Sequence, residues 1–268
     1  MQCDSQSWSR AGVCVVLVPT MGALHAGHEA LIRRARKLAG PGGMVVASVF
    51  VNPAQFNNAR DLRAYPNTLA ADKKLCRAEG VDVLFAPRTL YAGNASVAIE
   101  ETDVSLGMEG ASRPGHFCGV ATVVVKLFNL VRPDAAVFGA KDWQQSALIK
   151  RVVRDLDLPV RVVVEPTVRE PDGLACSSRN FLLSAAERRR ATVLWRAIGL
   201  ARKAARSGGL RGLKQKLTLF IEQQTGARVE YVEFFDEQTL KPMKPGKGAR
   251  LALAVFIGKT RLIDNARI

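Results

Sequence analysis

Two histidines three residues apart are the clearest sign of chemistry in this chain. His25 and His28 lie in VPTMGALHAGHEALIRRAR, where an apolar run stops at Pro19 and a helical pattern begins after Gly27. The N-terminus of a helix offers N–H groups and a partial positive charge, which favour phosphate. Imidazoles at positions i and i+3 share one side of a helix. A histidine there can donate a hydrogen bond to charge that builds on a phosphoryl group. The alternatives are ordinary turn chemistry or half of a metal site.

Polar side chains also follow two other strand candidates. Asn52 and Gln55 end the stretch SVFVNPAQF, and amides in such a place can bind hydroxyl and carboxylate groups without adding charge. Lys141 and Asp142 open a helix in FGAKDWQQ. A lysine suits phosphate, and a carboxylate suits Mg²⁺ or a ribose hydroxyl. Taken alone, each stretch is equally compatible with turn or helix-cap chemistry.

A fourth polar stretch, REPDGLACSSRN, covers residues 169–180. It predicts a turn at 171–173, followed by Ser177, Ser178 and Arg179. Two hydroxyls beside a guanidinium can clamp a phosphate. The stretch lies between two predicted domains, a position that suits a mobile lid.

Strand and helix patterns alternate through the part of the chain that carries the first three stretches. The strand candidates are Val13–Val18, Met44–Val51, Val81–Ala86, Ala135–Phe138 and Val160–Glu165, and the helix candidates are Gly27–Leu38, Thr68–Glu79, Gly119–Val131 and Lys141–Leu156. Continuous apolar strands are typical of sheets buried on both faces. The alternation predicts an α/β fold with a Rossmann-like, doubly wound, mainly parallel sheet. Ligands of such sheets bind at the carboxyl ends of the strands, near a topological switch point.

The pattern changes after about residue 170. Ser184 and Glu187 form a predicted capping box that opens a helix. This helix is expected to place Leu194, Ile198, Ala201 and Ala205 on one face and to end at Gly208 and Gly209. A second helix is expected at Leu210–Gln224, then strands at Val229–Asp236, Arg250–Ile257 and Arg261–Asn265, the last two joined by a tight turn. We therefore expect a Rossmann-like domain at 1–167 and a smaller α+β domain at 168–268.

Composition limits the classes of protein to which the chain can belong. Apolar residues make up 48% of the 268 residues, but no uninterrupted run is long enough for a membrane helix, and the first twelve residues do not resemble a secretory signal. The five cysteines are scattered, which favours reduced thiols in the cytoplasm. A formal net charge of +15 favours polyanionic partners, but the 6% content of aromatic residues argues against a base-stacking nucleic-acid platform. A solvated basic surface on helices is the simpler explanation of the charge.

The four stretches, in this order and spacing, resemble the pantothenate synthetase family of the HxGH nucleotidyltransferase superfamily. The resemblance covers nearly the whole chain and includes YPNTLAAD (65–72), EGASRPGHF (109–117) and RLIDN (261–265). It implies an ATP-dependent ligase that acts in two steps. The carboxylate of pantoate attacks the α-phosphate of ATP to give pantoyl adenylate and pyrophosphate, and the amine of β-alanine then displaces AMP. The family also implies a homodimer.

The resemblance assigns roles to individual residues. His28, His25 and Lys141 would be catalytic. The ATP-binding residues would be Met21, Gly22, His25, Gly27, His28, Gly139, Ala140, Lys141, Asp142, Val168, Cys176, Ser177, Ser178 and Arg179. Gln55, Gln145 and Asn52 would bind pantoate, and Gln55 would bind β-alanine as well. Asp142 would bind Mg²⁺.

Two alternatives stay open, and one of them rests on a departure from the family. Ala140 stands where the family usually has a glutamate, so a carboxylate near the nucleotide or metal is missing. The chain could therefore be a non-catalytic binder of nucleotide or nucleic acid, although the intact histidines argue against this. It could also be another HxGH nucleotidylyltransferase, which leaves AMP on its product. Gln55 and Gln145, which suit a small hydroxy acid, argue against that alternative.

Overall fold

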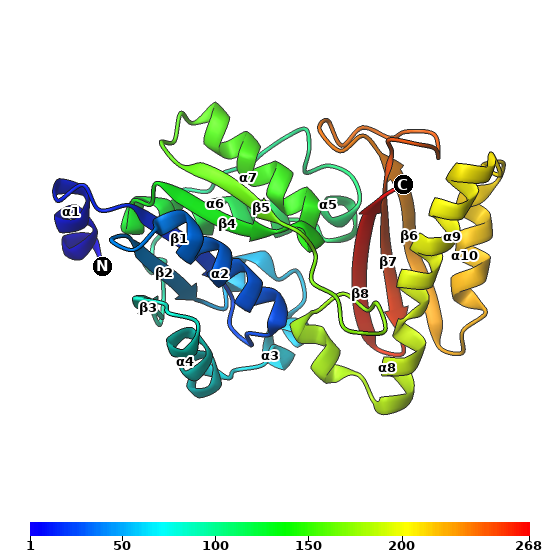
Figure 1. Ribbon diagram of the computed structural model, residues 1–268, viewed down its shortest axis with the longest axis horizontal. Coiled ribbons are helices and arrows are strands. Elements are labelled where there is room, and N and C mark those ends of the chain that lie inside the picture. The colour runs from blue at the N-terminus through cyan, green and yellow to red at the C-terminus, as the bar shows by residue number, and fades with distance from the viewer. The chain divides into compact units, whose positions relative to one another are not determined.

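The computed structural model describes the backbone of residues 1–268 and every side chain except those of Cys3 and Arg60. The chain forms two compact units (Figure 1). Unit 1 contains Met1–Ala140 and Gln144–Pro166, and unit 2 contains Lys141–Trp143 and Thr167–Ile268. Unit 2 therefore includes three residues that unit 1 flanks on both sides in the sequence. No helix within the described residues is long and apolar enough to cross a membrane.

Unit 1 is an α/β layer structure, as the alternation of patterns predicts. Its strands are β1 Val15–Thr20, β2 Met44–Val49, β3 Val83–Phe85, β4 Ala135–Gly139 and β5 Arg161–Glu165. Its helical elements are α1 Gln2–Arg10, α2 Ala26–Ala39, η1 Pro53–Gln55, α3 Ala59–Ala64, α4 Leu69–Ala78, α5 Glu109–Ser112, α6 His116–Val131 and α7 Trp143–Asp155, preceded by the 3-10 turn η2 Ala140–Asp142. Two of these elements cross the division between the units, since Lys141–Trp143 belongs to unit 2.

All the pairings in this sheet are parallel, and the strand order is β3-β2-β1-β4-β5. The chain builds outward from β1 to β3 and then returns to β4 on the other side of β1, so the topological switch point lies between β1 and β4. Val16 of β1 pairs with Val45 of β2 and Ala135 of β4. These three residues pack in one core with Ile32 of α2, which lies in front of the strands in Figure 1. The doubly wound fold is confirmed.

Strand β1 is longer at its carboxyl end than the sequence predicts. It continues through Pro19 to Thr20, although proline lacks the N–H group that a sheet uses. The carbonyl of Thr20 accepts a hydrogen bond from the N–H of Phe50 on the β2 side (3.1 Å), so the backbone of Pro19 faces the β4 side. On that side pairing stops at Leu17. The missing N–H therefore breaks no pairing with β4.

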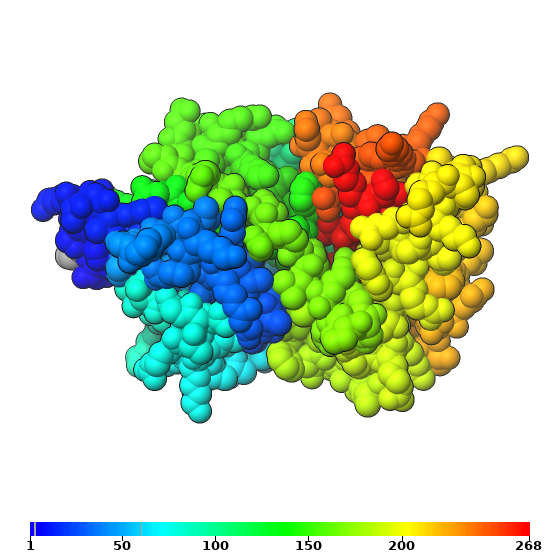
Figure 2. All heavy atoms as spheres, in the orientation of Figure 1, coloured from blue at the N-terminus to red at the C-terminus, as the bar shows by residue number. Residues whose placement is uncertain are grey.

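Unit 2 is an α+β structure. It contains η3 Ser178–Leu182, α8 Ala185–Ala191, α9 Val193–Ser207, α10 Leu213–Glu222 and the antiparallel strands β6 Ala227–Phe235, β7 Arg250–Ile257 and β8 Thr260–Arg267. Apolar residues of α9 and α10, among them Ile198 and Leu217, pack in one core with Leu253 of β7. The side chains of the three helices, yellow-green to orange-yellow in Figure 2, cover much of this face of unit 2.

The capping box at Ser184 is confirmed, but the helix that it opens is shorter than predicted. The hydroxyl of Ser184 accepts a hydrogen bond from the N–H of Glu187 (3.3 Å), and the Glu187 carboxylate accepts one from the N–H of Ser184 (2.9 Å). The helix then breaks at Thr192, where α8 gives way to α9. The Thr192 hydroxyl donates to the carbonyl of Arg189 (2.8 Å), a contact that competes with the regular helical ladder.

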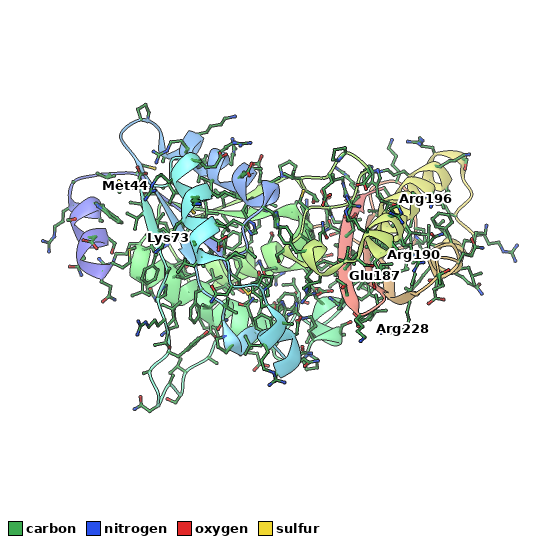
Figure 3. All side chains as sticks on the ribbon, turned by 90° about the horizontal axis from the view of Figure 1, so that it is seen from below. Met44, Lys73, Glu187, Arg190, Arg196 and Arg228 are labelled. Atoms are coloured by element: carbon green, nitrogen blue, oxygen red, sulfur yellow. The ribbon has the colours of Figure 1, made fainter. Side chains whose placement is uncertain are left out.

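Many basic side chains of unit 2 have partners within the chain. Arg190, Arg196 and Arg228, labelled in Figure 3, come from α8, α9 and β6. Arg190 donates to the carbonyl of Thr225 (3.2 Å), and Arg196 and Arg228 lie over aromatic rings of unit 2. These contacts agree with a solvated basic surface that also packs against its own unit.

Candidate active site

The two histidines form the N-terminal cap of α2. His25 is the N-cap residue, and its Nδ1 accepts a hydrogen bond from the N–H of Gly27 (3.1 Å). Nδ1 of His28 accepts one from the N–H of His25 (3.3 Å), which completes a reciprocal cap. The ring centroids lie 4.2 Å apart. Turn chemistry, the alternative to phosphate binding, is therefore present, and it does not exclude the binding of a ligand.

The cap determines which nitrogen of each ring carries the proton. A neutral imidazole that accepts at Nδ1 has its hydrogen on Nε2. His25 and His28 thus both have an Nε2–H donor at the start of α2, where the helix dipole is positive. Both rings are half-buried. Donors held in this way at a positive helix end suit an anionic ligand.

A buried carboxylate that sequence reasoning missed holds the loop before this helix. Asp72 of α4 is 2% exposed. Its two oxygens accept hydrogen bonds from the N–H groups of Ala23 (3.1 Å) and Leu24 (2.9 Å). Ala23 has φ 52°, which is unusual for a residue with a side chain, and Gly22 has φ 85°. Asp72 is the last residue of YPNTLAAD, one of the stretches that carry the resemblance, but no role was assigned to it.

The amide residues after β2 form a buried cluster. Asn52 is 1% exposed and donates through Nδ2 to Oε1 of Gln55 (3.0 Å) and to the carbonyl of Gly119 (3.0 Å). Its Oδ1 accepts from the N–H of Ala54 (3.2 Å) and from the hydroxyl of Tyr91 (2.9 Å). Burial raises the pKa of the Tyr91 hydroxyl. The two amide hydrogens and two acceptor positions of Asn52 are thus all used within the protein.

These contacts orient Gln55 and connect it to the loop after β1. With Oε1 bound to Asn52, Nε2 of Gln55 points to the sulfur of Met21 (3.1 Å). The carbonyl of Gln55 accepts a hydrogen bond from Nδ1 of His116 (2.8 Å). A Cβ atom on Gly119 would lie 2.3 Å from the carbonyl oxygen of Ala54, so only glycine lets α6 approach this closely. The sequence shows neither His116 nor Gly119 as part of this cluster, because both lie far from Gln55 along the chain.

The paired glutamines of α7 are used differently. Gln144 is buried; it donates to the carbonyls of Val104 (2.9 Å) and Gly107 (2.8 Å) and accepts from the N–H of Glu109 (3.0 Å). It therefore fastens the segment before α5. Gln145 is the next residue of α7 and is half-buried.

Lys141 and Asp142 belong to unit 2. The ammonium group of Lys141 lies 3.6 Å from the Asp142 carboxylate. The carbonyl of Lys141 accepts a hydrogen bond from Nδ2 of Asn265 (2.7 Å), and the indole N–H of Trp143 donates to the carbonyl of Glu237 (3.1 Å). Residues of the C-terminal sheet region therefore hold this segment at both ends.

The segment 168–179 is also anchored within unit 2. The N–H of Cys176 donates to the carbonyl of Val168 (3.0 Å), which brings two predicted ATP-binding residues together across the turn at 171–173. Arg169 makes a two-pronged ion pair with Asp264 of β8, at 2.7 and 2.9 Å. The Ser177 hydroxyl accepts from the N–H of Arg179 (3.2 Å) and caps η3. The predicted turn is confirmed, and Ser177, Ser178 and Arg179 are half-buried.

The predicted site residues fall into two sets, one in each unit. Unit 1 holds Met21, Gly22, His25, Gly27, His28, Asn52, Gln55, Gly139, Ala140 and Gln145, and unit 2 holds Lys141, Asp142, Val168, Cys176, Ser177, Ser178 and Arg179. Most of the first set follows β1, β2 and β4, which are neighbours in the parallel sheet. Their carboxyl ends therefore share one edge, at the switch point.

The fold and the HxGH cap define a doubly wound α/β protein with a histidine-capped helix at its first strand–helix junction. The chain belongs to the pantoate–β-alanine ligase family, whose model matches residues 1–267. It is 50% identical over 258 residues to a pantothenate synthetase of Akkermansia muciniphila, across 95% of this chain and 92% of that protein. It is 46% identical to one of Chlorobium phaeovibrioides, across 99% and 92% of the two chains.

Solved structures agree with this membership. The pantothenate synthetase of Thermus thermophilus matches with a TM-score of 0.89 and 44% identity, over 97% of this chain and 96% of that one. The pantoate–β-alanine ligase of Francisella tularensis, complexed with beta-gamma ATP and β-alanine, matches with a TM-score of 0.79 and 37% identity, over 96% and 90%. The resemblance inferred from the four stretches is therefore confirmed.

Proposed function

We propose that this chain catalyses the ATP-dependent condensation of pantoate with β-alanine to pantothenate. A carboxylate oxygen of pantoate attacks the α-phosphorus of ATP, and the bond from that phosphorus to the pyrophosphate oxygen breaks. The amine nitrogen of β-alanine then attacks the acyl carbon of pantoyl adenylate, the bond to AMP breaks, and the nitrogen loses a proton. Family membership across residues 1–267 carries this proposal.

The histidine cap of unit 1 would stabilise the phosphates in the first step. His28, with His25 beside it, would donate Nε2–H hydrogen bonds to the oxygens that gain charge as the bond to pyrophosphate breaks. Met21, Gly22 and Gly27 would let the nucleotide approach the backbone of the turn, and Gly139 and Ala140 would contact it from the end of β4. ATP itself activates the carboxylate, so the enzyme needs no nucleophile of its own and acts by alignment and charge stabilisation.

Unit 2 would supply the positive charge for the nucleotide. The cations are Lys141 and Arg179, with Ser177 and Ser178 as hydroxyl donors. Asp142, Val168 and Cys176 complete the proposed contacts. The hydrogen bond between Val168 and Cys176 supports a shared role for these two residues, because it keeps them side by side.

Pantoate would bind to Gln55 and Gln145, and β-alanine would bind near Gln55. Asn52 would serve pantoate through Gln55, because its own hydrogen-bonding groups already have partners in the protein. Two uncharged amides suit a substrate that carries both hydroxyls and a carboxylate. An amide can donate and accept hydrogen bonds, and it adds no charge to the site.

The residues present fit a Mg²⁺ ion that arrives with ATP. The described side chains contain no cluster of three or more histidine, cysteine, aspartate and glutamate residues that could hold a resident metal. Asp142 is a single carboxylate that is 45% exposed. Mg²⁺ commonly binds one or two carboxylates together with substrate phosphates and water. Such an ion would neutralise phosphate charge, and Asp142 would supply its protein ligand.

We further propose a cytoplasmic location, because the reaction consumes ATP, and a homodimeric assembly, as the resemblance implies. Neither the nucleotide-binding role nor the chemistry assigned above depends on the second copy. Sedimentation equilibrium tests the assembly: the mass of two chains supports a homodimer, and that of one chain contradicts it.

A coupled assay for AMP release tests the function. ATP, Mg²⁺, pantoate and β-alanine are supplied together and then omitted one at a time, and AMP release should need all four. Pyrophosphate release that needs only ATP and pantoate, with no AMP following, would place a defect in the second step. Release of neither product would contradict the proposal and favour a non-catalytic nucleotide binder, the alternative that Ala140 raises.

A further inference from the structure

Asn265 of β8 binds the main chain of a proposed catalytic residue. It is 5% exposed, and its Nδ2 donates a hydrogen bond to the carbonyl of Lys141 at 2.7 Å. Its Oδ1 accepts a hydrogen bond from Nη1 of Arg250, also at 2.7 Å. The amide therefore uses a donor on one side and an acceptor on the other, a combination that neither aspartate nor leucine supplies.

The far end of the same segment is held by Arg250, which also binds Asn265, and by Glu237. The guanidinium of Arg250 lies 3.5 Å from the ring centroid of Trp143 and pairs with Glu237 at 3.3 Å. The indole N–H of Trp143 donates to the carbonyl of Glu237. Burial lowers the pKa of Arg250, and Glu237 opposes the change. The Lys141–Trp143 segment is thus held by the Asn265 amide at Lys141 and by the stacked Arg250 at Trp143, all within unit 2.

The neighbouring positions of β8 anchor the second proposed nucleotide segment. Asp264 binds Arg169 at the start of segment 168–179, and the carbonyl of Arg261 accepts a hydrogen bond from Arg179 (3.4 Å). Arg261, Asp264 and Asn265 are the first, fourth and fifth residues of RLIDN, a stretch to which no role has so far been assigned.

We propose that Asn265 is a positioning residue for Lys141, and that the RLIDN strand is the platform that sets both cationic segments of unit 2. This inference rests on the proposed function. Asn265 does not touch substrate; it fixes the main chain of Lys141 and so limits where the ammonium group reaches. A small displacement of a catalytic group can cost a large part of its effect.

Asn265→Asp is the sharpest disruption, because it changes one atom of the side chain. The remaining Oδ1 still accepts from Arg250, and the added charge is paired with that guanidinium. The second oxygen, however, faces the Lys141 carbonyl, where two acceptors repel each other. We expect pantoate-dependent exchange of pyrophosphate into ATP, which reports the first step alone, to fall by about 10²-fold. The KM for β-alanine should not change.

A double-mutant cycle with Lys141→Ala distinguishes positioning from a general structural role. If Asn265 acts through Lys141, Asn265→Asp should cost less than about 3-fold in the Lys141→Ala background, because the group that it positions is already gone. If the two losses multiply, Asn265 does not act through Lys141 and the inference is wrong. Both single variants and the pair are measured by the same exchange assay.

Two further variants keep the test decisive if Asn265→Asp folds poorly. Trp143→Phe removes the other tether while leaving a ring beneath Arg250, and its loss should likewise depend on Lys141. Leu217→Val trims a buried core residue of α10 in the same unit, so it should lower the melting temperature and leave exchange unchanged. An equal loss of exchange in Leu217→Val would mean that stability of unit 2, not the contact to Lys141, matters. The wild-type assay of AMP release separates these outcomes from a failure of the proposed function.

Discussion

The histidine turn of unit 1 and the Lys141–Trp143 segment of unit 2 are both proposed to act on phosphate, but they are held in different ways. His25 and His28 cap each other's backbone within a single helical turn. Lys141 is held by Asn265 and Trp143 by Glu237, partners 124 and 94 positions away in the sequence. A locally built site can be recognised from a short motif. A site built from distant partners needs the folded unit before its purpose is visible.

The difference also has an energetic side. A helix cap contributes about 1 kcal/mol and forms with the helix itself. The hold on Lys141 exists only when β6, β7 and β8 are paired, so it is gained and lost together with the fold of unit 2. We therefore expect a substitution in the histidine turn to affect mainly the residue that is changed. A substitution in the C-terminal sheet should instead affect Lys141, which lies far away in the sequence.

The largest expected effect comes from His28, because it has two separable roles. His28→Ala should slow pantoyl-adenylate formation by roughly 10²-fold or more, the range for a lost transition-state donor. His28→Gln should slow it similarly while keeping the cap, since glutamine at this position can accept the N-cap N–H as in a capping box. Single-turnover release of pyrophosphate measures the rate of adenylate formation. Thermal unfolding measures how much stability is lost with the helix cap.

The two variants test whether His28 takes part in catalysis or only stabilises the helix. If His28→Gln has near-normal turnover while His28→Ala does not, the ring serves the helix alone and the proposed catalytic role is wrong. If both are stable and slow, the cap and the chemistry are separate, and the motif has been interpreted correctly.

A smaller effect is expected at Asp72, a distant anchor of the loop that precedes the histidine turn. Asp72→Asn places an NH₂ group against a buried backbone N–H of the Ala23–Leu24 loop. The cost should be about 2 kcal/mol of the free energy of unfolding, within the range for a lost hydrogen bond to a charged group. The apparent KM for ATP should rise by about tenfold, which corresponds to a weakening of 1.4 kcal/mol.

Asp82→Asn is the matched control for this change. The Asp82 carboxylate also accepts a backbone N–H in unit 1, that of Val45 at 2.7 Å, but at the amino end of β2. It should lower stability and leave the KM for ATP unaltered. An equal rise in KM for both variants would show that loss of stability, and not loss of the loop anchor, weakens nucleotide binding.

Sequence reasoning succeeded where periodicity or a local motif carries the information. Continuous apolar strands indicated the parallel sheet, and β7 begins and ends at the predicted residues, Arg250 and Ile257. The break at Thr192 was missed because a hydroxyl bond to Arg189 interrupts a helical pattern that continues on both sides. Asp72 and Asn265 were missed for another reason. Their partners are backbone groups of distant segments, and a backbone N–H or carbonyl leaves no mark in the amino-acid sequence.

The smallest effect is expected at the tip of segment 168–179, where an exposed ion pair tests the importance of burial. Arg188 holds the pKa of the Asp172 carboxyl below its ordinary value, and the N–H of Leu174 adds to this. A carboxyl with a lowered pKa in the folded state stabilises the protein above its unfolded pKa, near 4, and loses this contribution as the pH falls through the folded value. Because Asp172 is 45% exposed, we expect less than about 1 kcal/mol at pH 7.

Urea unfolding of the wild type and Asp172→Asn at pH 7, 5 and 3 measures this contribution. Asparagine keeps an oxygen for the N–H of Leu174 and removes only the charge. The two curves should differ slightly at pH 7 and 5, and the difference should shrink between pH 5 and 3, because the carboxyl binds protons in the unfolded state before it does in the folded state. A difference as large as that of Asp72→Asn, or one that does not shrink by pH 3, would contradict this expectation. It would also mean that an ion pair at the surface fixes segment 168–179 as firmly as the buried pair of Arg169 and Asp264. Burial would then not explain which contacts stabilise the segment.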